Sequence, residues 1–165
     1  MKRLAAVVAI LVTSALGVGM SINAVAQSAQ DLVGTWEWVS VDNTTPNGVT
    51  TQPFGPKPGG YLSFDRNGRF FWLITRPGRT KFGSGRRDQG TADENKATVQ
   101  GSLAYCGTYA ISGDTLILKI EASTYPNEEG AEQRRTFVLT GDQLSWRNPT
   151  VSTGASGIAR LRRVH

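Results

Sequence analysis

The side chains that most often carry enzymatic chemistry are scarce in this chain. Its one histidine, His165, is the last residue, and its one cysteine is Cys106. A serine or cysteine nucleophile activated by histidine therefore has no partner at a usable position. Metal sites built from histidine and cysteine, and histidine ligation of haem, lack their ligands. We expect no metal and no cofactor, and we expect Cys106 to be a small buried apolar residue.

Arg135 is the polar residue whose position is most informative. It shares a strand face with Phe137, so alternation places it inside the protein, near a long loop. A buried guanidinium is costly unless it is paired. It either clamps the carboxylate of a ligand or forms an internal ion pair with Glu121 or Glu132.

A second cationic group lies in the segment RPGRTKF, residues 76–82. Arg76 and the two cations that follow it could form a rim that attracts anionic ligands. The alternative is a solvated loop without a partner. The glycine-rich segment GSGRRDQG at 83–90 matches no phosphate-binding loop, because no strand–loop–helix order surrounds it.

The N-terminus has the three parts of a secretory signal. Lys2 and Arg3 precede an apolar run of 15 residues, Leu4 to Val18, and AVA at 24–26 fits a small-x-small cleavage site. A membrane span needs roughly 20 apolar residues. We therefore expect a signal peptide at 1–26, cleavage after Ala26, a periplasmic or secreted protein that does not insert into a membrane, and a single domain at 27–165.

The charge of the chain argues against nucleic acid as a partner. Without Lys2 and Arg3, 16 basic residues face 13 acidic ones, and no basic run exceeds two residues. Nucleic-acid binding needs a clustered basic patch or stripe. Charge-driven binding to a membrane surface is unsupported for the same reason.

The remaining chain reads as strands separated by turn residues. We expect eight strands, near 33–41, 60–65, 69–75, 104–111, 115–123, 133–140, 143–147 and 157–164. Short and long connections alternate along the chain. The tight turns are DRNGR at 65–69, SGD at 112–114 and TGDQ at 140–143; the long connections are 42–59, 76–103, 124–132 and 148–156.

This alternation predicts a barrel with one plain end and one open end. Successive connections of an up-and-down sheet lie at opposite ends, so the long loops gather at one mouth. The predicted fold is an all-β, eight-stranded antiparallel up-and-down barrel, which has no free edges. One short helix at about 91–100 would lie in a mouth loop, begun by a capping box of Thr91 and Glu94. A two-sheet sandwich of the same strands is the alternative.

The interior of such a barrel holds side chains or one small ligand. Alternation turns an apolar and aromatic set inward, and the mouth adds polar groups. A ligand cavity and a packed core both have this character. The predicted ligand-binding residues are Trp38, Phe64, Trp72, Arg76, Tyr105, Tyr109, Leu118, Ile120, Tyr125, Arg135 and Phe137, with Leu62 and Leu139 beside them in the interior.

LVGTWEWVSV, residues 32–41, contains the Gly-x-Trp signature GTW. It is one of five segments that resemble the small bacterial and fungal lipocalin-like domain family of the calycin superfamily. The others are PFGPKPGGYLSFDRNGRF, RPGRTKF, YCGTYAI and EASTYPNEEGAEQRRTF. Together they run from Leu32 to about Phe137. The resemblance implies a lipocalin-like barrel that holds a small molecule.

The resemblance also implies structural roles at the closed end. In lipocalins the tryptophan of the Gly-x-Trp signature closes the barrel floor, and an arginine near the end of the last strand stacks on it. Gly34 and Trp36 would take the first role. The last strand carries Arg160, Arg162 and Arg163, and we assign a structural role to the first two.

Two positions depart from the family pattern. Lys119 stands where the family often has a histidine, and Glu128 replaces a tryptophan that commonly follows the Pro-Asn pair. Any activity that needs that imidazole or that indole is not expected here.

Three functions remain open. The first is an exported protein that binds a small apolar or amphipathic, possibly anionic, molecule at the open end. The second is a cofactor-independent isomerase or cyclase, with Glu121, Tyr105 and Tyr109 as weak candidates for its acid or base. The third is a packed barrel that acts through its surface as an envelope interaction protein. The absence of a catalytic set favours binding over an enzyme.

Overall fold

The computed structural model describes residues 28–151 and 154–165, so the expected signal peptide and its cleavage site lie outside the described residues. Within these ranges no helix is long and apolar enough to cross a membrane. The elements in chain order are α1 (Ala29–Leu32), β1 (Gly34–Thr44), β2 (Thr50–Thr51), β3 (Tyr61–Phe64), β4 (Arg69–Thr75), α2 (Ala92–Gln100), β5 (Ser102–Ser112), β6 (Thr115–Ser123), η1 (Pro126–Glu128), β7 (Glu132–Thr140), β8 (Gln143–Asn148) and β9 (Ser156–Arg163).

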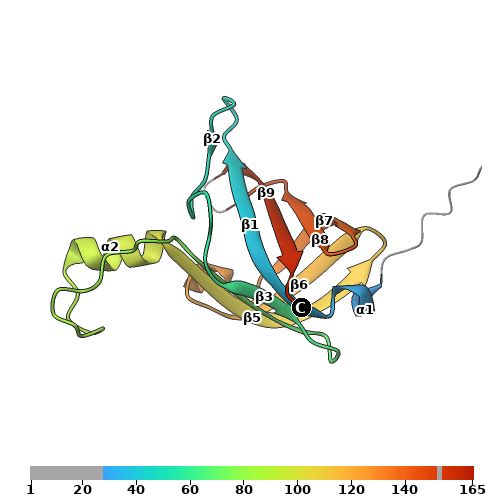
Figure 1. Ribbon diagram of the computed structural model, residues 1–165, viewed down its shortest axis with the longest axis horizontal. Helices are drawn as coiled ribbons and strands as arrows, with labels where there is room; N and C mark the ends of the chain where they lie inside the picture. Colours follow the sequence, from blue (N-terminus) through green and yellow to red (C-terminus); the bar gives the residue numbers. More distant parts are fainter. Residues whose placement is uncertain (1–27, 152–153) are drawn as a thin grey trace, which may run out of the picture.

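The strands form a closed antiparallel barrel (Figure 1). Neighbours in sequence pair from β3 to β9, and β1 closes the ring by pairing with both β3 and β9. The eight-stranded up-and-down barrel is thus confirmed, and the sandwich alternative is wrong. The two-residue β2, which the sequence did not indicate, folds back onto the end of β1 through the pair Asn43–Thr51.

The connections divide between the two ends as expected. At the hairpin from β3 to β4, the Asp65 carboxylate accepts hydrogen bonds from the backbone nitrogens of Asn67 and Arg69, both at 2.8 Å. Gly68 completes this turn with a φ of +78°, a conformation that favours glycine. The long connection from β4 to β5 carries α2 away from the barrel (Figure 1). Its predicted capping box is present between Thr91 and Glu94.

The inward faces of the strands form one core. All but one of the predicted interior residues are buried: Trp38, Leu62, Phe64, Trp72, Tyr105, Tyr109, Leu118, Ile120 and Phe137. Leu139 is partly buried and packs against them. Cys106 is an exception to our expectation, because it is half-buried and pairs in register with the exposed Phe71. Neighbours in a strand face opposite sides, so Cys106 next to the buried Tyr105 lies on the outer face.

The closed end is built around Trp36, which is fully buried. Its indole nitrogen donates to the Leu32 carbonyl of α1 at 2.9 Å. The Arg163 guanidinium carbon lies 4.1 Å from the centroid of the Trp36 ring. At Gly34, with a φ of +133°, a Cβ atom would lie 2.9 Å from Arg163 Nη1. The Gly-x-Trp signature therefore leaves room for the arginine that covers the tryptophan.

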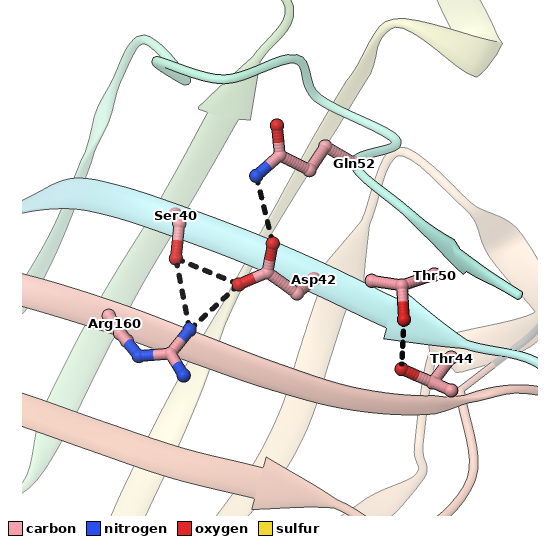
Figure 2. A network of polar contacts seen from close by, with 6 residues as sticks. All are labelled: Ser40, Asp42, Thr44, Thr50, Gln52 and Arg160. Carbon is pink, nitrogen blue, oxygen red and sulfur yellow. Dashed lines mark hydrogen bonds and ion pairs between the residues drawn. The ribbon is translucent and has the colours of Figure 1, made fainter. Parts of the chain in front are cut away.

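The structural roles assigned to Arg160 and Arg162 need correction, because the stacking arginine is Arg163. Arg162 pairs with Glu37 on the outer face. Arg160 donates to the Asp42 carboxylate at 2.7 Å. Figure 2 shows that this carboxylate also accepts from Ser40 and from Gln52, which belongs to the connection between β2 and β3. Arg160 thus helps to fix a mouth connection and does not close the floor.

Candidate ligand-binding site

A cavity of about 750 Å³ opens among the long loops at the mouth of the barrel. Its inner wall consists of apolar and aromatic side chains from the strands. The connections add residues from each of the long loops, among them Phe54, Val99, Tyr125 and Val151. The barrel interior is therefore packed at the closed end and hollow at the open end.

Arg135 lies in the wall of this cavity with 4% of its surface exposed. Arg135 is the fourth residue of β7 and lies against two adjacent indoles. Its guanidinium carbon is 4.7 Å from the Trp72 ring centroid and 5.4 Å from that of Trp146. A cation over an aromatic face is stabilised by the ring's quadrupole, most when both groups are desolvated. The inward position predicted for Arg135 is correct.

The hydrogen bonds of Arg135 are made by one nitrogen. Nη2 donates to the Tyr105 hydroxyl at 2.9 Å and to the Gln133 side-chain oxygen. The expected ion pairs with Glu121 and Glu132 are absent from the described part of the chain, since these carboxylates pair with Arg69 and Arg134. Both two-pronged edges of a guanidinium include Nη2, so neither edge is free for a bidentate carboxylate.

In the described part of the chain, the buried polar side-chain atoms that make no hydrogen bond are concentrated around the cavity. Across residues 28–151 and 154–165, six buried side-chain atoms have no hydrogen-bond partner in the protein, and all six belong to residues that line this cavity. Buried polar groups are almost always paired, so such a concentration indicates a site for a polar group. The atoms are Asn43 Oδ1, Trp72 Nε1, Glu128 Oε2, Arg135 Nε, Arg135 Nη1 and Trp146 Nε1.

Burial shifts two titratable groups in the wall. It raises the pKa of Tyr105 to about 12, although the positive charge of Arg135 opposes the shift. It also raises the pKa of Glu128, again against the effect of Arg135. The phenol therefore stays protonated near neutral pH: its oxygen accepts from Arg135, and its own proton remains available to an acceptor in the cavity.

A family model for the lipocalin-like domain matches residues 33–161. The chain belongs to the lipocalin-like domain family. None of the curated protein sequences matches it. Among solved structures it is similar to secretory abundant heat soluble protein 4 from Ramazzottius varieornatus, with a TM-score of 0.41, 18% identity, and coverage of 84% of this chain and 99% of that chain.

Four of the predicted ligand-binding residues line the cavity of this lipocalin-like barrel: Trp72, Tyr105, Tyr125 and Arg135. Trp38 lies against the wall from behind. Its indole contacts Trp72 at a centroid distance of 4.5 Å and donates to the Leu73 carbonyl at 2.9 Å. Four others, Phe64, Leu118, Ile120 and Phe137, belong to the packed core outside the cavity lining.

Two of the acid–base candidates lie away from the cavity. The Tyr109 hydroxyl donates to the Asp65 carbonyl at 2.8 Å, at the tight-turn end of the lipocalin-like barrel. Glu121 is exposed on the outer face and pairs with Arg69 at 2.6 Å. A register shift in the β5–β6 pairing does not turn it inward, because Ile120 keeps the inward position. In the described ranges, no group of three or more His, Cys, Asp or Glu side chains could hold a metal ion.

Arg76 positions a loop instead of offering a free cation. Its Nε and Nη2 donate to the Pro53 carbonyl at 3.0 and 2.6 Å. Together with the Gln52–Asp42 hydrogen bond of 2.9 Å (Figure 2), this contact holds the segment that places Phe54 in the cavity wall. Arg76 therefore does not serve as a free cation in the rim that the segment RPGRTKF was expected to form.

Sequence reasoning missed three important wall residues. Trp146 alternates with the buried Leu144 on β8, a signal that pointed inward. Glu128 drew notice only as a departure from the family pattern. Phe54 gave no signal, because its place depends on contacts between loops far apart in sequence.

Proposed function

We propose that this lipocalin-like protein binds a small amphipathic molecule in the open end of its barrel. The polar head lies against Arg135 and the indole nitrogens, and the apolar body extends toward the mouth. One observation carries the proposal: the buried polar atoms that lack partners in the described structure all line the same cavity. A ligand that supplies those partners gains hydrogen bonds in a desolvated site.

The size and lining of the cavity support this function. Ligand pockets are mostly apolar, span about 300–1,000 Å³ and carry a few placed polar groups; this cavity has about 750 Å³. The outer position of Glu121 and the raised pKa of Tyr105 support binding over acid–base catalysis. The signal-like segment at 1–26 supports export, which we include in the proposal.

Native mass spectrometry of the mature protein, purified gently from the envelope of its own host, tests the proposal. We expect a small-molecule adduct on the wild type. Arg135→Met should lose the adduct, because methionine keeps the apolar stem and removes the donors. Arg147→Met is the matched control: this arginine is exposed beside Trp146 and does not line the cavity.

Absence of any adduct, together with no binding from a panel of amphipathic acids, amides and alcohols, would refute the binding function. An adduct that survives Arg135→Met unchanged would place the ligand elsewhere.

A further inference from the structure

Glu128 contributes a second charged group to the cavity, opposite in sign to Arg135. It is the last residue of η1, in the mouth loop between β6 and β7, and it lines the cavity. Its Oε2 is buried and has no hydrogen-bond partner in the protein. In the described part of the chain no ion pair joins it to Arg135, although the two charges influence each other.

In the described part of the chain, the charges around the cavity leave one cation and one anion without an ion pair. The Gln133 side chain accepts a hydrogen bond from Arg135 and also hydrogen-bonds to Glu128. Four charged residues line it, and Arg134 pairs with Glu132 at 2.8 Å. Arg135 and Glu128 remain. A neutral ligand keeps this arrangement balanced. A carboxylate ligand would add a second negative charge beside Glu128, and like charges at short range in a low-dielectric site repel strongly.

The geometry of Arg135 also removes the usual advantage of a carboxylate. A carboxylate binds arginine best through two parallel hydrogen bonds. Here Nη2 is occupied by Tyr105 and Gln133, and only Nε and Nη1 lack partners. Single acceptor oxygens, such as those of an amide or an alcohol, fit these separate donors as well as a carboxylate does.

We propose that Glu128 is the specificity-determining residue of the cavity, and that the ligand has a neutral head group carrying both a hydrogen-bond acceptor and a donor, as in a carboxamide or an alcohol. The acceptor receives hydrogen bonds from Arg135 or an indole nitrogen, and the donor meets Glu128 Oε2. The inference rests on the proposed binding function and names the ligand class of that site.

The test compares two probes that share a chain and differ in the head group, decanamide and decanoate. Binding is followed by tryptophan fluorescence, since Trp72 and Trp146 line the cavity. At about pH 8 the carboxylate probe is ionised. We expect the wild type to bind decanamide about tenfold or more tightly than decanoate. Glu128→Gln removes the negative charge in a side chain of the same shape, and should reverse or abolish that preference.

Glu129→Gln is the matched control, because it removes the same charge from the adjacent residue, which is exposed and does not line the cavity. It should keep the wild-type preference. If the wild type binds both probes equally or prefers decanoate, the inference is overturned while the binding function stands. If Glu128→Gln folds and keeps the wild-type preference, Glu128 is not the determinant. If neither probe binds the wild type, nor any longer amide, alcohol or acid, the binding function itself fails. The wild-type ratio remains a test even if Glu128→Gln does not fold.

Discussion

An arginine lies against tryptophan at each end of the barrel, and the two sites differ in what else the guanidinium touches. At the closed end Arg163 covers Trp36 and donates to the backbone carbonyls of Val33 at 2.6 Å and Asp31 at 2.7 Å. At the open end Arg135 lies against two adjacent indoles, and only its Nη2 has hydrogen bonds. The arginine and tryptophan donors thus have hydrogen-bond partners at the closed end, whereas several of them lack partners at the open end.

The contacts at the closed end stabilise the fold, whereas those at the open end leave donors that suit ligand binding. The closed end uses carbonyls from the segment that enters β1, so the arginine, the tryptophan and the chain entry hold one another in place. The Trp36 indole nitrogen is paired as well. The open end leaves the indole nitrogens of Trp72 and Trp146 without partners. Unpaired buried donors destabilise a fold. A ligand that accepts hydrogen bonds from these donors would offset that cost, which explains why they occur around a cavity.

The largest expected effect is at the closed end. Trp36→Ala should lower the free energy of unfolding by about 3–5 kcal/mol, because it removes a fully buried indole and its stacked arginine. Trp146→Ala should lower the free energy of unfolding by less, because the Trp146 ring already borders an open cavity. Urea unfolding followed by circular dichroism measures both. Equal losses would mean that the two ends pack alike and would contradict the comparison.

The two arginines should differ in the direction of their effect. Arg163→Met leaves the Val33 and Asp31 carbonyls without their donors and should lower the free energy of unfolding by about 1–3 kcal/mol. Arg135→Met removes a buried charge that lacks an ion pair in the described structure and should leave stability unchanged or raised. The same denaturation experiment measures this, with Arg147→Met as the surface control. A loss at Arg135 as large as that at Arg163 would make the open-end arginine structural.

The barrel itself could be predicted because its signals are local. Period-two alternation and glycine turns depend on neighbouring residues, and the order of short and long connections then decides which end is open. The inward position of Arg135 followed from alternation along one strand. The partner of Trp36 did not follow, because choosing among three arginines requires the register of β9 on β1, which sets Arg163 opposite Trp36.

The cavity was harder to predict than the strands that surround it. Its floor is set by how far side chains fill the barrel, and alternation does not tell a packed layer from a hollow one. Phe64 and Tyr109 face inward as expected but fill the closed end, with ring centroids 4.7 Å apart. Phe54 enters the wall only because Arg76 and Asp42 hold its loop from outside.

A pH titration of ligand binding tests whether the charge of Glu128 affects anions at the open end. Burial raises the pKa of Glu128 above its ordinary value of 4.5. Its carboxyl therefore loses its negative charge at a higher pH than an ordinary glutamate does, as the pH falls through the raised value. Decanesulfonate, which stays anionic throughout, should bind about tenfold more tightly once that charge is gone. Tyr105 does not titrate in this range, with a pKa of about 12, and Glu132 is paired with Arg134 at the rim.

Fluorescence titration of decanesulfonate from neutral pH downward measures the change. Glu128→Gln should bind this probe at the tighter level and with no such dependence. A wild-type affinity that is constant across the range, or that weakens as the pH falls, would show that Glu128 exerts no repulsion on an anion in the cavity.

The smallest expected effect is that of removing the Gln52–Asp42 hydrogen bond, which holds a mouth connection from outside the barrel. The hydrogen bond from Gln52 is the main reason that the pKa of Asp42 is lowered, with Ser40 and Arg160 also contributing (Figure 2). A lowered pKa means that this contact stabilises the fold above the ordinary pKa of the carboxyl, and that the contribution is lost as the pH falls through the lowered value. Gln52→Ala should therefore lower the free energy of unfolding by only about 0.5–1 kcal/mol near neutral pH.

The effect of Gln52→Ala should nevertheless be concentrated at the mouth. Amide hydrogen exchange should quicken at Gly55, whose nitrogen donates to the Gln52 carbonyl at 2.9 Å, and at the neighbouring Phe54. It should stay unchanged at Trp36 on the closed end, since Asp42 lies near the other end of the same strand. Gln143→Ala, an exposed glutamine at the tight-turn end, serves as the control. Exchange that quickens equally at both ends would show that the barrel responds as one unit, and that its mouth has no separate support.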